Sequence, residues 1–210
     1  NIQGSGMHLH LSLFKGEENA FYSADDPYNL SPTAKCFMAG LLRHAAEITA
    51  VTNQTVNSYK RLVPGFEAPV HISWARNNRS GLIRVPVPKK GNAMATRIEY
   101  RSPDPATNPY LAFSVILAAG LRGVEQGYTL PAEADANLFE MNDADLNKLS
   151  IEQLPQSLAD ALDIMERSEL VASALGEHIF EWFLRNKRSE WSDYKAQVTQ
   201  FELDRYLPAW

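Results

Sequence analysis

One apolar segment limits the folds open to this chain more than any other feature. The residues from Tyr110 to about Gly127 are rich in Leu, Ala and Ile, and Pro109 before them is a favourable first helical residue. A helix of this composition is buried on most of its sides. We therefore predict a central core helix that other elements surround.

Two other segments alternate between apolar and polar residues with the period of a β-strand. One runs from Met7 to Phe14 and the other from Thr96 to Arg101. Each therefore has one apolar face that can pack on a core. The opposite faces carry His8, His10 and Ser12 in the first segment, and Arg97, Glu99 and Arg101 in the second.

Local signals predict the remaining elements. Ser31 and Pro32 can begin a helix whose apolar residues recur at helical spacing as far as about Asn53. Residues 156–206 are helical in pattern, with breaks near three residues. The three breaks in this helical pattern lie near Ser168, Gly176 and Thr199. Short strands are predicted at 70–75 and 82–85.

Together these elements indicate one α+β domain or two closely packed lobes. We predict a curved antiparallel sheet that carries the charged strand faces on its concave side. Helices 32–52 and 109–127 and the helical C-terminal region are expected to back this sheet.

Composition excludes several classes of function. The 210 residues carry a net charge of -5, which provides no electrostatic footprint for nucleic acid or an anionic membrane surface. The single cysteine excludes an internal disulfide, and no apolar run approaches the roughly 20 residues that span a bilayer. Neither a GxxxxGK[ST] nor a GxGxxG motif occurs, which disfavours a P-loop NTPase and a Rossmann dinucleotide site. We expect a cytoplasmic protein without nucleic-acid or membrane partners.

The polar strand faces are candidate sites. Two arginines flanking Glu99 suit an anionic ligand that meets a metal ion, although a solvent-facing ladder of ion pairs would have the same pattern. His8 and His10 can reach a common site, and a histidine with a glutamate on a neighbouring strand makes a partial metal shell. Two histidines with ordinary structural roles are the alternative.

Arginines are conspicuous in this acidic chain because several interrupt apolar or turn-rich segments. Guanidinium groups bind polyphosphates and carboxylates bidentately, so such a set suits their recognition. Any single member could equally be a scattered surface arginine. The set comprises Arg61, Arg79, Arg84, Arg97 and Arg101.

Four segments together resemble consecutive parts of one enzyme family. They are GSGMHLHLSLF, NSYKRLVPGFEAPV, NNRSGLIRVP and TRIEYRSPDPATNPYLA. In this order they resemble the C-terminal part of the catalytic domain of class I glutamine synthetase. The resemblance implies a glutamine synthetase/guanido kinase-like catalytic fold over residues 1–210, without the N-terminal β-grasp domain and the first catalytic strands. It also implies a homo-oligomer, a ring of twelve subunits in the full-length parent.

The resemblance implies ATP-dependent ligation of ammonia to the glutamate side-chain carboxylate through γ-glutamyl phosphate, with Mg2+ or Mn2+. The isolated chain is expected to be inactive or nearly so. Two alternatives stay open: a γ-glutamyl amine ligase of the same family, which would use amines such as polyamines, and a non-catalytic relative.

The resemblance also assigns roles to individual residues. The metal ligands would be His8 and Glu99, and the ATP contacts would be His10, Ser12, Arg84 and Arg97. The glutamate contacts would be Gln3, Gly4, Arg61 and Arg101. The catalytic pair would be Glu67, a flap carboxylate that shields the acyl phosphate, and Arg79, which neutralises the transferring phosphoryl group. Gln3 departs from the family, which usually has Asn at this position.

Overall fold

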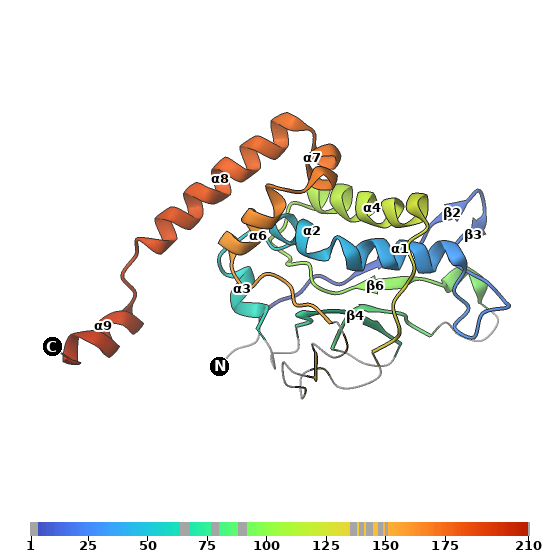
Figure 1. Ribbon diagram of the computed structural model, residues 1–210, viewed down its shortest axis with the longest axis horizontal. Coiled ribbons are helices and arrows are strands. Elements are labelled where there is room, and N and C mark those ends of the chain that lie inside the picture. The colour runs from blue at the N-terminus through green and yellow to red at the C-terminus, as the bar shows by residue number, and fades with distance from the viewer. Residues whose placement is uncertain are drawn as a thin grey trace.

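The structure is a computed structural model in which a layer of helices covers one side of a sheet (Figure 1). It describes residues 4–63, 68–76, 80–87, 92–134, 138, 141, 145–146, 149 and 151–209. The helices are α1 (Pro32–Arg43), α2 (Ala45–Thr52), α3 (Ser58–Arg61), α4 (Pro109–Gln126), α6 (Leu158–Met165), α7 (Glu169–Leu175), α8 (Glu177–Lys195) and α9 (Gln200–Tyr206). Short 3-10 turns occur at η1 (Ala93–Ala95) and η3 (Leu207–Ala209).

Within the described residues, the main sheet has four strands in the order β1-β6-β5-β4. These are β1 (Leu9–Leu11), β4 (His71–Ala75), β5 (Gly81–Arg84) and β6 (Ile98–Tyr100). A small hairpin of β2 (Phe14–Lys15) and β3 (Glu18–Asn19) turns at Gly16, whose φ of 62° suits glycine. The predicted α+β class is thereby confirmed.

The prediction of an antiparallel sheet was wrong for one pair of strands. β6 is antiparallel to both β1 and β5, but β4 and β5 run parallel, with an irregular register between His71 and Trp74. Side-chain alternation reports which face of a strand is buried and contains no information on the direction of its neighbour. The sheet is therefore mixed.

The predicted starts of two helices, at Pro32 and at Pro109, are confirmed. Ser31 and Asn108 accept hydrogen bonds from the first turns of α1 and α4, and Gly127 ends α4 in the left-handed conformation. The single helix predicted over 32–52 is instead two helices, because the chain breaks at His44 (φ -100°, ψ 9°). The apolar spacing continues across this break, so the sequence pattern does not reveal it.

The C-terminal helices begin at the predicted breaks but do not pack on the sheet as expected. Ser168, Gly176 and Thr199 are the N-cap residues of α7, α8 and α9. α6 contacts α2, α7 contacts α4, and α8 contacts both α6 and α7. From there α8 and α9 extend outward from the body (Figure 1). Amphipathic spacing indicates that a helix buries one face, but not against which partner.

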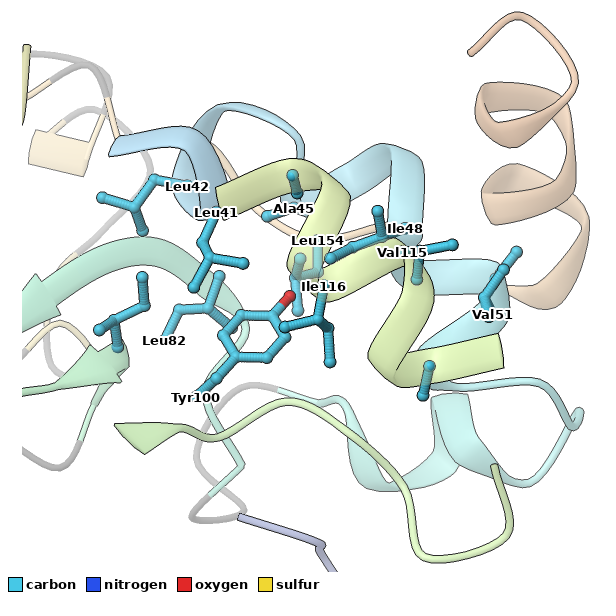
Figure 2. Packing of buried hydrophobic residues seen from close by; sticks show 14 of the residues in the cluster. Leu41, Leu42, Ala45, Ile48, Val51, Leu82, Tyr100, Val115, Ile116 and Leu154 are labelled. Carbon is cyan, nitrogen blue, oxygen red and sulfur yellow. The ribbon is translucent and has the colours of Figure 1, made fainter. Parts of the chain in front are cut away.

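Tyr100 links the helical layer to the sheet. Its side chain is fully buried and lies among aliphatic residues of α1, α2, α4 and β5 (Figure 2). Burial raises the pKa of its hydroxyl to about 12. Because side chains alternate along β6, a buried Tyr100 places Glu99 on the opposite face, away from the helices.

Helices α1 and α4 approach closely where glycines replace side chains. A methyl group added at Gly40 would lie 2.2 Å from the carbonyl oxygen of Ala119, and one at Gly123 would lie 2.1 Å from that of Cys36. Both obstacles are backbone atoms, which cannot rotate away. No helix in the described ranges combines the length and the apolar character needed to cross a membrane.

The Gly40→Ala substitution tests this crossing. Alanine favours an isolated helix by about 1 kcal/mol relative to glycine. We nevertheless expect a net loss of about 1–3 kcal/mol in the free energy of unfolding, because the added methyl overpacks the interface. Urea unfolding measures the difference, and Ser173→Ala on the exposed side of α7 should change stability by less than about 0.5 kcal/mol. A stabilised Gly40→Ala protein would contradict the close contact.

Candidate functional site

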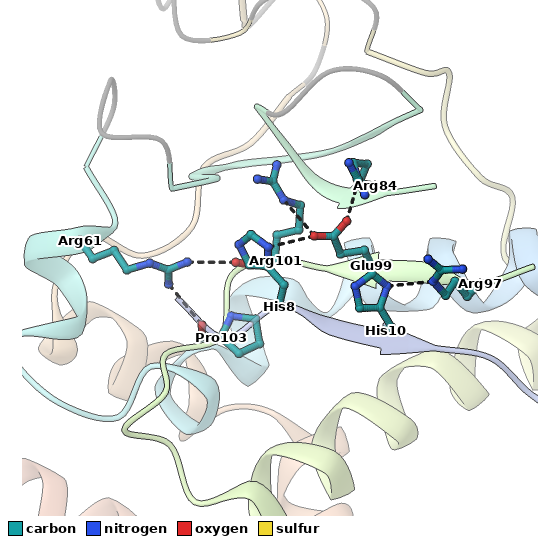
Figure 3. Close-up of polar contacts among 8 residues, drawn as sticks. All are labelled: His8, His10, Arg61, Arg84, Arg97, Glu99, Arg101 and Pro103. Atoms are coloured by element: carbon teal, nitrogen blue, oxygen red, sulfur yellow. Dashed lines mark hydrogen bonds and ion pairs between the residues drawn. The ribbon is translucent and has the colours of Figure 1, made fainter. Parts of the chain in front are cut away.

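Strand register aligns polar residues across three strands. His10 of β1 and Arg84 of β5 both pair with Glu99 of β6, from opposite sides. Arg97 and Arg101 flank Glu99 along the chain and, by strand alternation, share its face. Figure 3 shows these side chains together on the face of the sheet that the core helices do not cover. The predicted gathering of two histidines, a glutamate and three arginines is therefore present.

Glu99 is the centre of the cluster. Its carboxylate is almost completely buried, at 7% exposure of the side chain. One oxygen, Oε1, lies 2.9 Å from Nδ1 of His8 and 3.7 Å from Nε of Arg101, while Oε2 lies 2.6 Å from Nε of Arg84 (Figure 3). A buried carboxylate among two guanidinium groups is an ion-pair network rather than a solvent-facing ladder.

The charges around Glu99 set the protonation states of the site. Burial acts to raise the pKa of Glu99, but Arg84 and Arg101 outweigh it and hold this pKa below its ordinary value. Burial lowers the pKa of His8, and Arg101 lowers it further against the opposing effect of Glu99. At neutral pH the site therefore presents an ionised carboxylate and a neutral imidazole, the two forms that bind metal ions.

His10 and Arg97 form a second contact beside this network. Nε of Arg97 donates to Nδ1 of His10 at 3.1 Å, and Nη1 donates to the carbonyl of Ala95. Asn19, which sequence reasoning did not single out, supports the same region. Its amide donates to three carbonyl oxygens between residues 93 and 96. Asn19 thereby connects the β2–β3 hairpin to the segment that precedes β6. An asparagine in a polar loop offers no sequence signal for this role.

Arg61 comes from α3 and is 8% exposed. Its Nη1 donates to the carbonyls of Ser102 and Pro103, at 2.8 and 3.3 Å, and Nη2 donates to that of Arg101 at 3.1 Å. Gly4 lies against the aliphatic part of this side chain, since a methyl group added there would be 3.1 Å from Cβ of Arg61. Arg61 and Gly4 thus lie together, next to the segment that carries Arg101.

Four other predicted residues are not part of the gathered cluster. Ser12 lies one position beyond β1, is exposed, and lines an apolar cavity of about 180 Å³ between β1 and helices α1 and α4. Its predicted place near ATP stays a prediction. Gln3, Glu67 and Arg79 lie outside the described residues.

Comparison with known proteins identifies the family. The family model described as "Glutamine synthetase, catalytic domain" matches residues 1–206. The chain belongs to the glutamine synthetase catalytic-domain family. It is 57% identical over 204 residues to a glutamine synthetase of Mycolicibacterium smegmatis and 50% identical over 206 residues to one of Thermotoga maritima.

Both comparisons cover almost the whole chain, 97% and 98%, but only 46% of each relative. The chain therefore spans about half the length of the curated glutamine synthetases that it matches. Solved structures with the same fold include a GmaS–ADP complex, with a TM-score of 0.85, 40% identity, and coverage of 98% of this chain and 46% of that one. An unliganded GmaS has a TM-score of 0.83 at the same identity, and the match covers 97% of this chain and 45% of that chain.

In this member of the glutamine synthetase family, the site supplies part of the coordination shell of a divalent cation. An imidazole nitrogen and a carboxylate oxygen 2.9 Å apart can serve as two ligands of one ion. Among the described residues, no group of three or more His, Cys, Asp or Glu side chains could hold a metal. Further ligands must come from water, substrate or residues beyond those described. The arginines nearby suit anionic groups bound to such an ion.

The Glu99→Gln substitution tests the ion-pair network. Glutamine keeps the shape but leaves two guanidinium groups without their carboxylate. Because Arg84 is 36% exposed and partly screened, we expect a loss of about 1–3 kcal/mol in the free energy of unfolding, below the cost of breaking a fully buried pair. Glu125→Gln makes the same chemical change at an exposed pair with Arg122 and should cost less than about 0.5 kcal/mol. Equal losses would show that the Glu99 pairs contribute no more than a surface pair.

Proposed function

We propose that this chain is the C-terminal part of the catalytic domain of an enzyme that joins ammonia to the side-chain carboxylate of glutamate at the expense of ATP. The main support is the buried Glu99, which contacts His8 and two arginines in a chain 57% identical to a protein named glutamine synthetase. A non-catalytic relative has no need to place like charges together at a buried position, where they repel.

In the proposed first step, a carboxylate oxygen of glutamate attacks the γ-phosphorus of ATP. The bond from phosphorus to the bridging oxygen breaks and ADP leaves, so γ-glutamyl phosphate forms. Both reactants are anions, and fixed cations that offset their repulsion supply much of the catalysis in phosphoryl transfer. We assign Arg84 and Arg97 to the ATP phosphates, Arg101 and Arg61 to glutamate, and Arg79 to the transferring group.

In the proposed second step, the nitrogen of ammonia attacks the acyl carbon, phosphate leaves with the electrons of the broken C–O bond, and the nitrogen gives up one proton so that the neutral amide of glutamine forms. Ammonium has no free electron pair, so it must lose a proton before it can attack. We assign this deprotonation, and the shielding of the acyl phosphate from water, to Glu67. Gln3 and Gly4 would contact glutamate, and His10 and Ser12 would lie near the nucleotide.

A divalent cation, Mg2+ or Mn2+, would be held by His8 and Glu99. When bound, it would neutralise charge on the phosphate oxygens. The neutral imidazole and ionised carboxylate described above are in the protonation states that this role requires. Glutamates on the first catalytic strands of the parent would supply the remaining protein ligands, and the N-terminal domain of a neighbouring subunit in a homo-oligomeric ring would complete the active site.

The structural comparison also includes proteins that are not named glutamine synthetase. The two GmaS structures share 40% identity with this chain, and the glutamine synthetases of M. smegmatis and T. maritima share 57% and 50%. The higher identity favours ammonia as the acceptor. A γ-glutamyl amine ligase remains the alternative, and it uses the same phosphorylated intermediate.

Phosphate release by the full-length enzyme tests the reaction and its acceptor. With ATP, Mg2+ or Mn2+ and glutamate, we expect release that requires ammonia, and a kcat/KM for ammonia at least about tenfold above those for methylamine and putrescine. Mass spectrometry should detect glutamine as the product. A preference for an amine would support the amine ligase, and no release with any acceptor would refute the proposal.

Metal binding provides a test that does not depend on turnover. We expect calorimetric titration of the full-length enzyme with Mn2+ to show binding that His8→Ala weakens by about tenfold or more. The matched control is His178→Ala, which removes an exposed imidazole from α8 and should leave affinity unchanged. Identical isotherms for the His8→Ala and wild-type proteins would remove His8 from the metal site.

A further inference from the structure

The segment before β1 passes directly over the guanidinium group of Arg61. A methyl group added at Gly6 would lie 2.4 Å from Nη2, 2.9 Å from Cζ and 3.2 Å from Nε of that arginine. Distances below about 3 Å are not tolerated between such atoms, so any side chain at Gly6 would have to displace the guanidinium group. A side chain at position 6 would therefore need the space that the guanidinium group of Arg61 occupies.

Backbone conformation does not account for this glycine. In the described part of the chain, positive φ angles at glycine occur at Gly16, Gly127 and Gly176, and not at Gly6. The backbone at Gly6 is thus accessible to alanine. What position 6 requires is the absence of a side chain.

The guanidinium group that lies there connects three segments of the site. It donates to the carbonyls of residues 101, 102 and 103, directly after the strand that carries Glu99. The carbonyl of Pro103 also accepts from the backbone N–H of Met7 at 2.8 Å, so the segment before β1 is bound to the same point. Displacing the guanidinium group would break charge-assisted hydrogen bonds and release the backbone beside Arg101.

We propose that Gly6 is a positioning residue that acts through Arg61: its missing side chain determines where the guanidinium group lies, and so shapes the site that recognises the glutamate carboxylate. This role rests on the proposed function. The two glycines act on different parts of Arg61, since Gly4 faces the aliphatic part of the side chain and Gly6 faces the charged end.

A double-mutant cycle in the full-length enzyme tests the proposal. We expect Gly6→Ala to lower kcat/KM for glutamate by about tenfold or more while KM for ATP changes less than about twofold. In an Arg61→Ala background the space is open, so adding Gly6→Ala should change kcat/KM by less than about twofold. The matched control is Ser5→Ala, between the two glycines and exposed, which should behave as wild type.

Thermal unfolding of the same four proteins separates this inference from the proposed function. Gly6→Ala should lower Tm in the wild-type background and leave it unchanged, or raise it, in the Arg61→Ala background. This comparison holds even if the enzyme lacks ligase activity, which would refute the proposed function alone. Should Gly6→Ala fail to fold, the double variant should recover folding. Equal effects of Gly6→Ala in both backgrounds, or none in wild type, would overturn the positioning role.

Discussion

A single carboxylate organises the charged side of this sheet. Glu99 contacts three residues: His8 directly before β1, Arg84 of β5, and Arg101 directly after β6. Without a negative charge at this point, the guanidinium groups would be close to one another in a poorly solvated place and would repel. The ion-pair network thus holds together the groups that the proposed phosphoryl transfer requires.

That carboxylate depends in turn on the core behind it. Tyr100, the next residue along β6, is fully buried under α1, α2 and α4. The packing of these helices therefore determines the orientation of the whole strand, and with it the direction in which Glu99 points. Glycines at the α1–α4 crossing permit the close approach of the two helices. Helix packing and the chemistry of the site are in this way coupled through one strand.

Glycines permit close contacts both between the helices and at the site on the opposite face of the sheet. At Gly40 and Gly123 the absence of a side chain lets two helix backbones meet, and at Gly6 it leaves room for a guanidinium group. The obstacles differ, because backbone atoms cannot move aside and the end of an arginine can. A substitution in the helices therefore acts by separating two backbones, whereas one at Gly6 acts by displacing the guanidinium group of Arg61.

Features that depend on near neighbours in the chain follow from the amino-acid sequence alone. Strand alternation predicted which faces of β1 and β6 are charged, and Ser31, Pro32 and Pro109 predicted where α1 and α4 begin, because these signals act within a few residues. The motif resemblance also predicted the family. Four features became evident only from the folded chain: the parallel pairing of β4 and β5, the break at His44, the packing of the C-terminal helices on other helices, and the contact of Gly6 with Arg61. Each of these depends on segments distant in sequence or on competing packing, which periodicity does not encode.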